Sequence, residues 1–303
     1  MDLFPEHAGA SRYHSSMRFL LAILGLAFSC NALSQVMVRD DYGRAVTLEQ
    51  PAARVVSLSP HLTELLYAAG AGSKVVGTVE YSDYPPEARL LPRVGSNAAV
   101  NLEALLALRP DLVVAWPNAA TLRSIERLGE LGLPVYRSEP RELEEIALTL
   151  ERLGRLAGSE AQAARAARAF RARVAGLAKR YAARPAVRVF YQVWDRPLLT
   201  VNGQHVISKV IRLCGGENVF ERLPLIAPEI DREMVLRANP DAIVAGSGSE
   251  LESWKRFPAM TAAAQGHFYW IAPDLIQRHT PRILEGAERM CEILEKVRRA
   301  ARS

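Results

Sequence analysis

The polar and aromatic residues that could do chemistry in this chain follow short apolar runs. One segment, Ser57-Leu58-Ser59-Pro60-His61, places two hydroxyls and an imidazole directly after such a run. Ligands bind at the carboxyl ends of strands in α/β folds, so this segment could face a ligand. The two serines lack the flanking glycines of a nucleophile elbow, and the segment therefore does not predict a hydrolase.

Other catalytic and metal-binding patterns are also absent from the sequence. No two histidines or cysteines have the short spacing that zinc sites use. The histidines at positions His61, His205, His267 and His279 are isolated from one another along the chain. The Gly215-Gly216 pair follows a predicted helix and is explained by the end of that helix rather than by phosphate binding. We therefore predict that the chain is not an enzyme and holds neither a cofactor nor a metal of its own.

A further set of aromatic and polar side chains is better explained by ligand binding. All of them stand where a predicted strand gives way to a predicted helix, at the edge that should face a cleft. The set comprises Ser59, Pro60, Tyr81 to Pro86, Trp116, Pro117, Trp194 to Pro197, Asp274, Leu275, Ile276, Gln277 and Arg278. Apolar and aromatic walls with a few polar groups suit a large, partly apolar, neutral ligand. For any single aromatic in the set, ordinary loop packing is the alternative.

The elements that must position these residues are β-rich runs alternating with helical patterns. In the first half we predict strands at 54–58, 75–78, 112–115 and 134–136, and helices at about 62–69, 101–108, 121–131 and 142–157. In the second half we predict strands at 187–192, 218–220, 242–245 and 268–270, and helices at about 204–213, 231–238, 252–262 and 281–300. Such alternation indicates α/β lobes with mostly parallel sheets. A hairpin over 36–48, with its turn near Tyr42-Gly43, should precede the first strand.

A long helix over 159–184, which ends before Pro185, should join the two halves. Its apolar residues recur at spacings of three and four and predict one buried stripe. They are Ala163, Ala166, Ala167, Phe170, Val174, Leu177 and Tyr181. The arginines between them predict a solvated face, because a surface for nucleic acid or membrane would want aromatic companions there. The chain has a net charge of +5, with its densest basic cluster in this helix.

An internal repeat relates the two halves in detail. Residues 101–115 align without gaps on residues 231–245, with six identities in fifteen positions. Each copy reads as a capped helix, a Pro-Asp turn and a buried strand, which predicts two similar lobes with a ligand cleft between them. Glu103 and Glu233 occupy the same position, in the first helical turn, where the helix dipole favours a carboxylate. Alternatively, these two acids form salt bridges with a pseudo-symmetric partner.

The N-terminus has the pattern of an export signal. Arg18 is followed by an apolar run that ends at Phe28 and then by small residues. The run is shorter than the roughly 20 residues of a membrane-spanning helix, so we predict a signal peptide with an upstream extension over 1–34, cleaved before Gln35. Translation could begin at Met1 or at Met17. Lipid attachment at Cys30 is the alternative to cleavage before Gln35.

The remaining cysteines, Cys214 and Cys291, form an even pair in an exported chain. Disulfides persist in oxidising compartments, so we predict that these two residues are bridged. The alternative is two buried thiols. We expect a lobe over 35–158 that includes the hairpin, the connecting helix over 159–184, and a second lobe over 185–303.

Several motifs resemble those of periplasmic cobalamin-binding proteins that serve ABC importers. This family lies within a wider class of substrate-binding proteins for siderophores, haem and cobalamin. The motifs are Arg54 to Pro60 followed by Thr63-Glu64, Tyr81 to Pro86, Asn101 to Trp116, Cys214 to Asn218, and Asp274 to Arg278 followed by Pro281-Arg282. The resemblance implies two α/β lobes joined by one rigid helix, with cobalamin or a related corrinoid held between them. It also implies a periplasmic location, a monomer, and delivery of the ligand to the membrane-spanning subunits of an importer.

Carried over residue by residue, the resemblance assigns ligand contacts to Tyr81, Trp116 and residues 274–278. It assigns transporter docking to Glu103 and Glu233, and it implies the disulfide between Cys214 and Cys291.

The chain departs from the family pattern at two cleft tryptophans. One is replaced by Asn97, and another, expected within 224–228, is replaced by aliphatic residues, so that Trp194 would have to compensate. Binding of a siderophore or haem is the alternative, with Tyr81 or His61 as the axial ligand of a haem.

Overall fold

The structure of the chain is a computed structural model that describes residues 35–96, 98–181 and 183–301. The predicted signal peptide, its cleavage point and Cys30 lie outside those residues, as does Asn97. Val36–Ser303 forms one compact unit. Within the described ranges, no helix is both long and apolar enough to cross a membrane.

The predicted hairpin is present at the start of this unit. Strands β1 (Val36–Arg39) and β2 (Ala45–Leu48) pair antiparallel, with Val36 opposite Leu48. Alternate residues of both strands are buried, as expected of a hairpin with one face on the core. Gly43 takes a φ of 76° in the turn, a conformation that costs glycine little.

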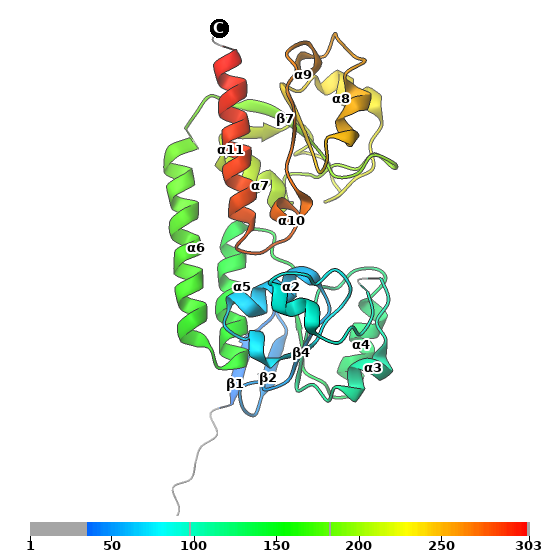
Figure 1. Cartoon of the computed structure of the whole chain (residues 1–303), viewed down its shortest axis with the longest axis vertical. Coiled ribbons are helices and arrows are strands. Elements are labelled where there is room, and N and C mark those ends of the chain that lie inside the picture. The colour runs from blue at the N-terminus through cyan, green and yellow to red at the C-terminus, as the bar shows by residue number, and fades with distance from the viewer. Residues whose placement is uncertain (1–34, 97, 182, 302–303) are drawn as a thin grey trace, which may run out of the picture. The chain divides into compact units, whose positions relative to one another are not determined.

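Two four-stranded sheets, each entirely parallel, follow the hairpin (Figure 1). The first has the order β4-β3-β5-β6 and the second the order β10-β9-β7-β8. The strands are β3 (Val55–Ser57), β4 (Val75–Gly77), β5 (Leu112–Ala115), β6 (Val135–Arg137), β7 (Val187–Gln192), β8 (Gly216–Asn218), β9 (Ala242–Ala245) and β10 (Phe268–Trp270). In both sheets the first strand in the chain pairs with the second and the third, and the fourth lies beside the third. The two lobes therefore share one topology, which confirms the prediction from the repeat.

Helices connect the strands of each sheet. The first lobe contains α2 (Pro60–Ala68), α3 (Leu102–Ala107), α4 (Leu122–Glu130) and α5 (Leu143–Ala157), with short 3₁₀ helices at Gly72–Lys74 and Pro86–Leu90. The second contains α7 (Val206–Leu213), α8 (Arg232–Ala238), α9 (Thr261–Ala264), α10 (Pro273–Ile276) and α11 (Ile283–Ala300).

One predicted helix is wrong. The sequence pattern predicts a helix over 252–262, but the structure has a 3₁₀ helix at Ser249–Trp254 and the separate short helix α9. Pro258 lies between them and lacks the N–H that a helix interior needs. A proline also disfavours the helical conformation at the residue before it, here Phe257. Leu251 and Trp254 of the 3₁₀ helix and Ala262 of α9 nevertheless pack in one apolar cluster.

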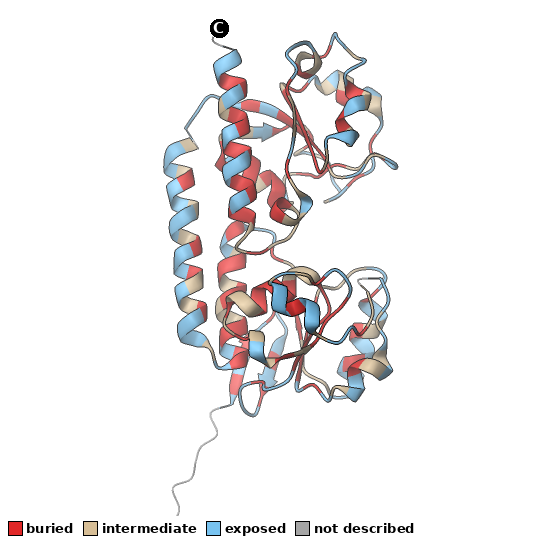
Figure 2. Cartoon of the chain, in the orientation of Figure 1, coloured by how far each residue is buried: buried red, intermediate tan, exposed pale blue. Residues whose placement is uncertain are grey.

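The connecting helix is α6 (Glu160–Tyr181), which contacts α2 and α5 of the first lobe and α7 and α11 of the second. Ala163, Ala167, Phe170 and Leu177 of its predicted stripe are buried, while Ala166, Val174 and Tyr181 are partly buried. Figure 2 shows the buried stripe on one side of α6 and an exposed opposite side. One apolar cluster includes β3 and β5 of the first lobe, α6, and β7 and β9 of the second. This shared core makes α6 an integral connection rather than a loose linker.

The predicted disulfide is confirmed. Cys214, at the end of α7, is bonded to Cys291 in the middle of α11. Both residues are fully buried within the shared core. Gly215 follows with a φ of 72°, so the glycine pair ends α7 as predicted. The bridge ties α7 to α11 inside the second lobe.

Candidate functional site

The predicted ligand residues lie after the carboxyl ends of strands in both sheets. Tyr81 comes after β4, Trp116 directly follows β5, and Trp194 comes after β7. Asp274 lies in α10, which follows β10. In parallel sheets these strand ends share one edge, so each sheet presents its part of the set at its own carboxyl edge.

Four hydroxyl side chains support the segment that carries Tyr81. The Oγ1 atom of Thr63 on α2 donates to Ser57 Oγ at 2.9 Å and lies 2.8 Å from Thr78 Oγ1. Thr78 in turn donates to Ser82 Oγ at 2.7 Å. All four residues are fully buried. This satisfied polar cluster connects the start of α2 to the loop after β4, and it was not predicted from the sequence.

Two aromatic side chains of the predicted set are largely exposed. Tyr81 is 74% exposed and has a φ of 63°, while Trp194 is 57% exposed. The indole N–H of Trp194 donates to the carbonyl of Arg196 at 2.9 Å, which holds the ring in one orientation. Trp116 is only partly buried, and its ring meets that of His61 edge to face with 5.9 Å between centroids. Exposed aromatic faces of this kind are the groups on which a large ring can stack.

Arg278 is the centre of an ion-pair network that joins the two lobes. Its Nη1 atom lies 2.8 Å from Glu64 Oε1 and 2.9 Å from Asp83 Oδ1, both in the first lobe. Its Nη2 atom lies 3.0 Å from Asp274 Oδ1 and donates to the carbonyl of Tyr81 at 3.2 Å. The predicted residues Tyr81, Asp274 and Arg278 are therefore brought together, across a separation of almost two hundred residues.

A second arginine completes this network. Arg282 Nη1 lies 3.3 Å from the same Glu64 oxygen, and its guanidinium stacks on the Tyr84 ring at 4.0 Å from the centroid. Burial raises the pKa of Glu64, and Arg278 and Arg282 oppose that effect. At Asp83 burial acts in the same upward direction, but the hydrogen bond and charge of Arg278 prevail and lower the pKa. The difference arises because Glu64 lies deeper in the protein.

Other members of the predicted set do not present their side chains at the surface. Leu275 and Ile276 are 9% and 0% exposed and belong to the shared apolar core. Short helix α10 turns those two residues inward, while Asp274, Gln277 and Arg278 stay partly exposed. Ser59 is also buried, at 2% exposure. Its Oγ atom lies 2.7 Å from the Nδ1 atom of His61.

Pro60 begins α2 and is partly exposed. Gln277 Nε2 donates to the hydroxyl of Tyr191 at 3.4 Å.

Three histidines that are isolated in the sequence meet in the structure. The ring of His279 lies 6.0 Å from that of His61 and 5.6 Å from that of His205, between centroids. Burial, together with the neighbouring histidines, lowers the pKa of His61 and His205 to about 3. Burial likewise lowers the pKa of His279 to about 4. These rings are therefore neutral at pH 7, and three histidines that are far apart in the sequence form one cluster in the structure.

No group of three or more His, Cys, Asp or Glu residues among those described is arranged to hold a metal ion.

The two predicted docking acids occupy equivalent exposed positions. Glu103 lies in the first turn of α3 and Glu233 in the first turn of α8. Asn101 caps α3 by accepting from the Ala104 N–H at 3.0 Å, and the corresponding Asp231 caps α8 at 2.7 Å from Met234 N. The same local structure therefore carries both acids.

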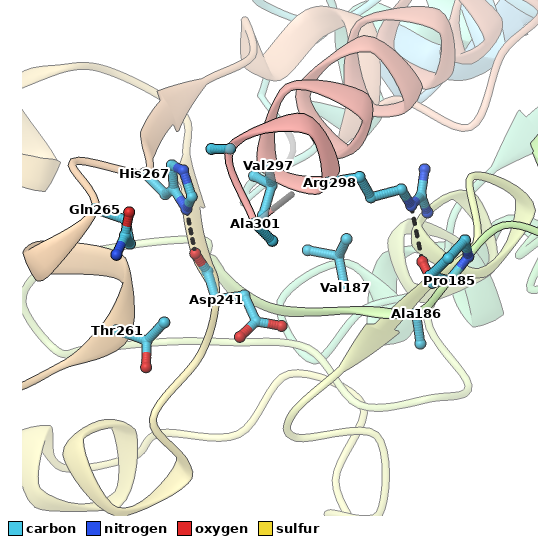
Figure 3. A pocket seen from close by; sticks show the side chains of 11 residues that line it. Pro185, Ala186, Val187, Asp241, Thr261, Gln265, His267, Val297, Arg298 and Ala301 are labelled. Atoms are coloured by element: carbon cyan, nitrogen blue, oxygen red, sulfur yellow. Dashed lines mark hydrogen bonds between the residues drawn. The ribbon is translucent and has the colours of Figure 1, made fainter. Parts of the chain in front are cut away.

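A cavity of about 470 Å³ lies elsewhere in the second lobe, beside the start of β7 and the end of α11 (Figure 3). Asp241 and His267 form part of its polar wall, and Val187 and Val297 part of its apolar wall. None of the predicted ligand residues lines it, so it is distinct from the candidate site.

The contacts between the lobes that involve Glu64, Asp83, Glu142, Lys209 and the three clustered histidines were not predicted from the sequence. Glu142, which caps α5, forms an ion pair with Lys209 of α7. Glu64 stood only in a motif, Asp83 and His61 stood in segments predicted to face a ligand, and Glu142, Lys209, His205 and His279 had no local signal for these contacts. Contacts between distant segments leave no periodicity in the sequence.

Comparisons with known proteins agree with this architecture. A family model described as periplasmic binding protein matches residues 55–275. The vitamin B12-binding protein of Vibrio cholerae is 37% identical over 248 residues, which cover 81% of this chain and 90% of that protein. The corresponding protein of Yersinia pestis is 38% identical over 251 residues, covering 82% and 88%.

Solved structures of periplasmic binding proteins share the fold of this chain. The periplasmic vitamin B12-binding protein BtuF of Vibrio cholerae has a TM-score of 0.76 at 36% identity and covers 82% of this chain and 98% of its own. The periplasmic heme-binding protein RhuT from Roseiflexus sp. RS-1 has a TM-score of 0.70 at 21% identity, covering 81% and 99%, and shows a shared fold alone. This chain, with its two parallel-sheet lobes joined through α6, belongs to the periplasmic binding protein family.

Proposed function

We propose that this chain binds cobalamin or a related corrinoid in the cleft between its lobes and delivers it to the membrane-spanning subunits of an ABC importer. The observation that carries the proposal is the 37% identity to a vitamin B12-binding protein over 81% of the chain. The protein acts as a monomer, with lobes over 35–158 and 185–303 and the connecting helix over 159–184. It binds and releases its ligand without changing it chemically.

The exposed side chains suit a corrinoid. A corrin is a large, partly apolar ring with amide groups around its edge, and the exposed faces of Tyr81 and Trp194 offer surfaces on which such a ring can stack. Asp274 is half exposed and can accept hydrogen bonds from ligand amides. Trp116 contributes a further aromatic edge. In this role Ser59, Leu275 and Ile276 support the site from the core, and Gln277 and Arg278 supply polar groups beside the ligand.

Docking to the importer uses the two equivalent acids. Glu103 and Glu233 are exposed, each at the start of a corresponding helix in its lobe. A transporter built from two similar subunits can present one basic site to each acid, so that both lobes are engaged together. Export through the signal peptide over 1–34 places the protein in the periplasm, with lipid attachment at Cys30 as the alternative form.

Calorimetry with purified protein tests the ligand. We expect micromolar or tighter binding of cyanocobalamin, and weaker binding of haemin and of a ferric siderophore. Haem binding would instead favour Tyr81 or His61 as an axial ligand, and it would show the shifted absorption of a coordinated haem. Absence of cyanocobalamin binding at micromolar concentrations would overturn the proposed ligand. Recovery of a chemically altered ligand would overturn the proposal that the protein is not an enzyme.

A further inference from the structure

Glu64 is a buried acid whose two ion-pair partners both come from the opposite lobe. Its side chain is 2% exposed, and one of its oxygens meets Arg278 at 2.8 Å and Arg282 at 3.3 Å. Glu64 lies on α2, whereas the two arginines lie between α10 and α11 and at the start of α11. A buried carboxylate needs such compensation, because an unpaired charge in the interior is strongly destabilising. The pairing therefore fixes the α10–α11 connection against the first lobe.

The other partners of Arg278 lie on the solvent side of the network. Asp83 and Asp274 have side chains that are 45% and 50% exposed, and Tyr81, whose carbonyl accepts from Arg278, is 74% exposed. Exposed ion pairs hold a side chain weakly, because solvent screens them and both partners remain mobile. The Arg278 guanidinium is thus held mainly by Glu64, and its exposed partners are the segments that face the proposed ligand.

We infer that Glu64 is a positioning residue for ligand binding, which acts through Arg278 and makes no contact with the ligand itself. This inference rests on the proposed function. By holding Arg278 from the buried side, Glu64 sets the spacing between the Tyr81–Asp83 segment of one lobe and Asp274 of the other. A ligand that contacts both segments then binds to a site that is already arranged. The protein segments therefore lose less conformational entropy on binding.

Replacement of Glu64 by glutamine tests whether the charge of Glu64 positions Arg278 for ligand binding. Glutamine has nearly the same shape and can still accept hydrogen bonds through its amide oxygen, but it carries no charge to hold two guanidinium groups. We expect Glu64→Gln to weaken cyanocobalamin binding roughly tenfold, which corresponds to about 1.4 kcal/mol. In an Arg278→Ala background, the same substitution should have no further effect, because the residue through which Glu64 acts is gone.

The matched control is Glu288→Gln. Glu288 on α11 pairs with Arg173 on α6 at 2.8 Å, and both side chains are nearly half exposed. This control removes the same charge from an ion pair that shares no residue with the network, and its affinity should stay within about twofold of the wild-type value.

The outcomes distinguish this inference from the proposed function. Wild-type protein that does not bind cyanocobalamin overturns the proposed function and the inference with it. Wild-type binding with unchanged affinity in Glu64→Gln overturns only the role of Glu64. An equal loss of affinity with and without Arg278 shows a purely structural role and also overturns it. If Glu64→Gln does not fold, Glu64→Asp tests the same contact in another way, because it keeps the charge but is one methylene shorter and so withdraws the carboxylate from Arg278.

Discussion

The two lobes repeat one construction, yet they are stabilised differently. Arg54 and Arg188 each reach back to a carbonyl at the end of the repeated helix, at 2.6 Å in both lobes. Asp111 accepts hydrogen bonds from two backbone N–H groups, whereas Asp241 accepts one from Arg188 and lines the cavity of Figure 3. The disulfide belongs to the second lobe, and the buried hydroxyl cluster to the first. A repeat thus preserves the backbone framework while each lobe acquires its own supports.

The largest expected effect concerns the equivalence of the two docking acids. The double change Glu103→Arg with Glu233→Arg should abolish ligand uptake while leaving cyanocobalamin affinity within about twofold, because both acids are exposed in the first turns of α3 and α8 and neither belongs to the proposed ligand set. Uptake in cells and calorimetry on the purified protein measure the two properties.

The control reverses the charge of two other exposed acids, Glu126 on α4 and Glu292 on α11. Uptake should persist in that variant. Loss of ligand affinity in the variant with both Glu103 and Glu233 changed would instead place those acids at the ligand. Uptake that persists in that variant would contradict the proposal that the two acids dock the lobes to the importer.

The next effect concerns the disulfide that distinguishes the second lobe. Replacement of Cys214 and Cys291 by serine should lower the free energy of unfolding by about 2–4 kcal/mol, because the bridge closes a long loop in the unfolded chain and the serines bury two hydroxyls. Denaturant titration followed by circular dichroism measures the change. A reductant should destabilise the wild-type protein and leave the double variant unaffected. A wild-type unfolding midpoint that is unchanged by the reductant would contradict the prediction.

The smallest effect concerns the residue before the Pro-Asp turn. Arg109 and Asn239 occupy corresponding positions and both have a left-handed backbone, with φ of 46° and 41°. Asparagine tolerates this conformation better than arginine. Arg109→Asn should therefore stabilise the protein by roughly 0.5 kcal/mol, and Asn239→Arg should destabilise it by at least as much.

The side-chain oxygen of Asn239 also accepts a hydrogen bond from the Thr261 N–H at 2.7 Å. Loss of this bond adds to the destabilisation expected for Asn239→Arg. Thermal melting of the two variants measures both changes. Opposite signs are expected, and a destabilised Arg109→Asn would show that the Arg109 side chain contributes more than its backbone conformation costs.

Much of the fold could be predicted because its signals are local. The apolar runs at 112–115, 187–192 and 242–245 were placed correctly to the residue, since a buried parallel strand is continuously apolar. The helix predicted over 252–262 failed because a proline outweighed an apolar pattern. The 3₁₀ helix at Pro86–Leu90 and the short helix α10 were also missed, since elements this short contain too few turns for a period.

The candidate site was predicted less completely. The junctions that carry Tyr81, Trp116 and Trp194 could be identified, because strand ends are visible in the sequence. The inward direction of Leu275 and Ile276 could not be predicted, because it depends on the packing of α10 against the core.

The sequence by itself determined the two similar lobes, the joining helix and the disulfide, because these follow from periodicity, from an internal repeat and from a cysteine count. Only the tertiary structure decided which residues meet between the lobes. Arg278 contacts Glu64 across 214 positions, and His61 approaches His279 across a similar interval. Such pairs depend on how two complete lobes are placed by α6 and their shared core, and no local pattern of residues encodes that placement.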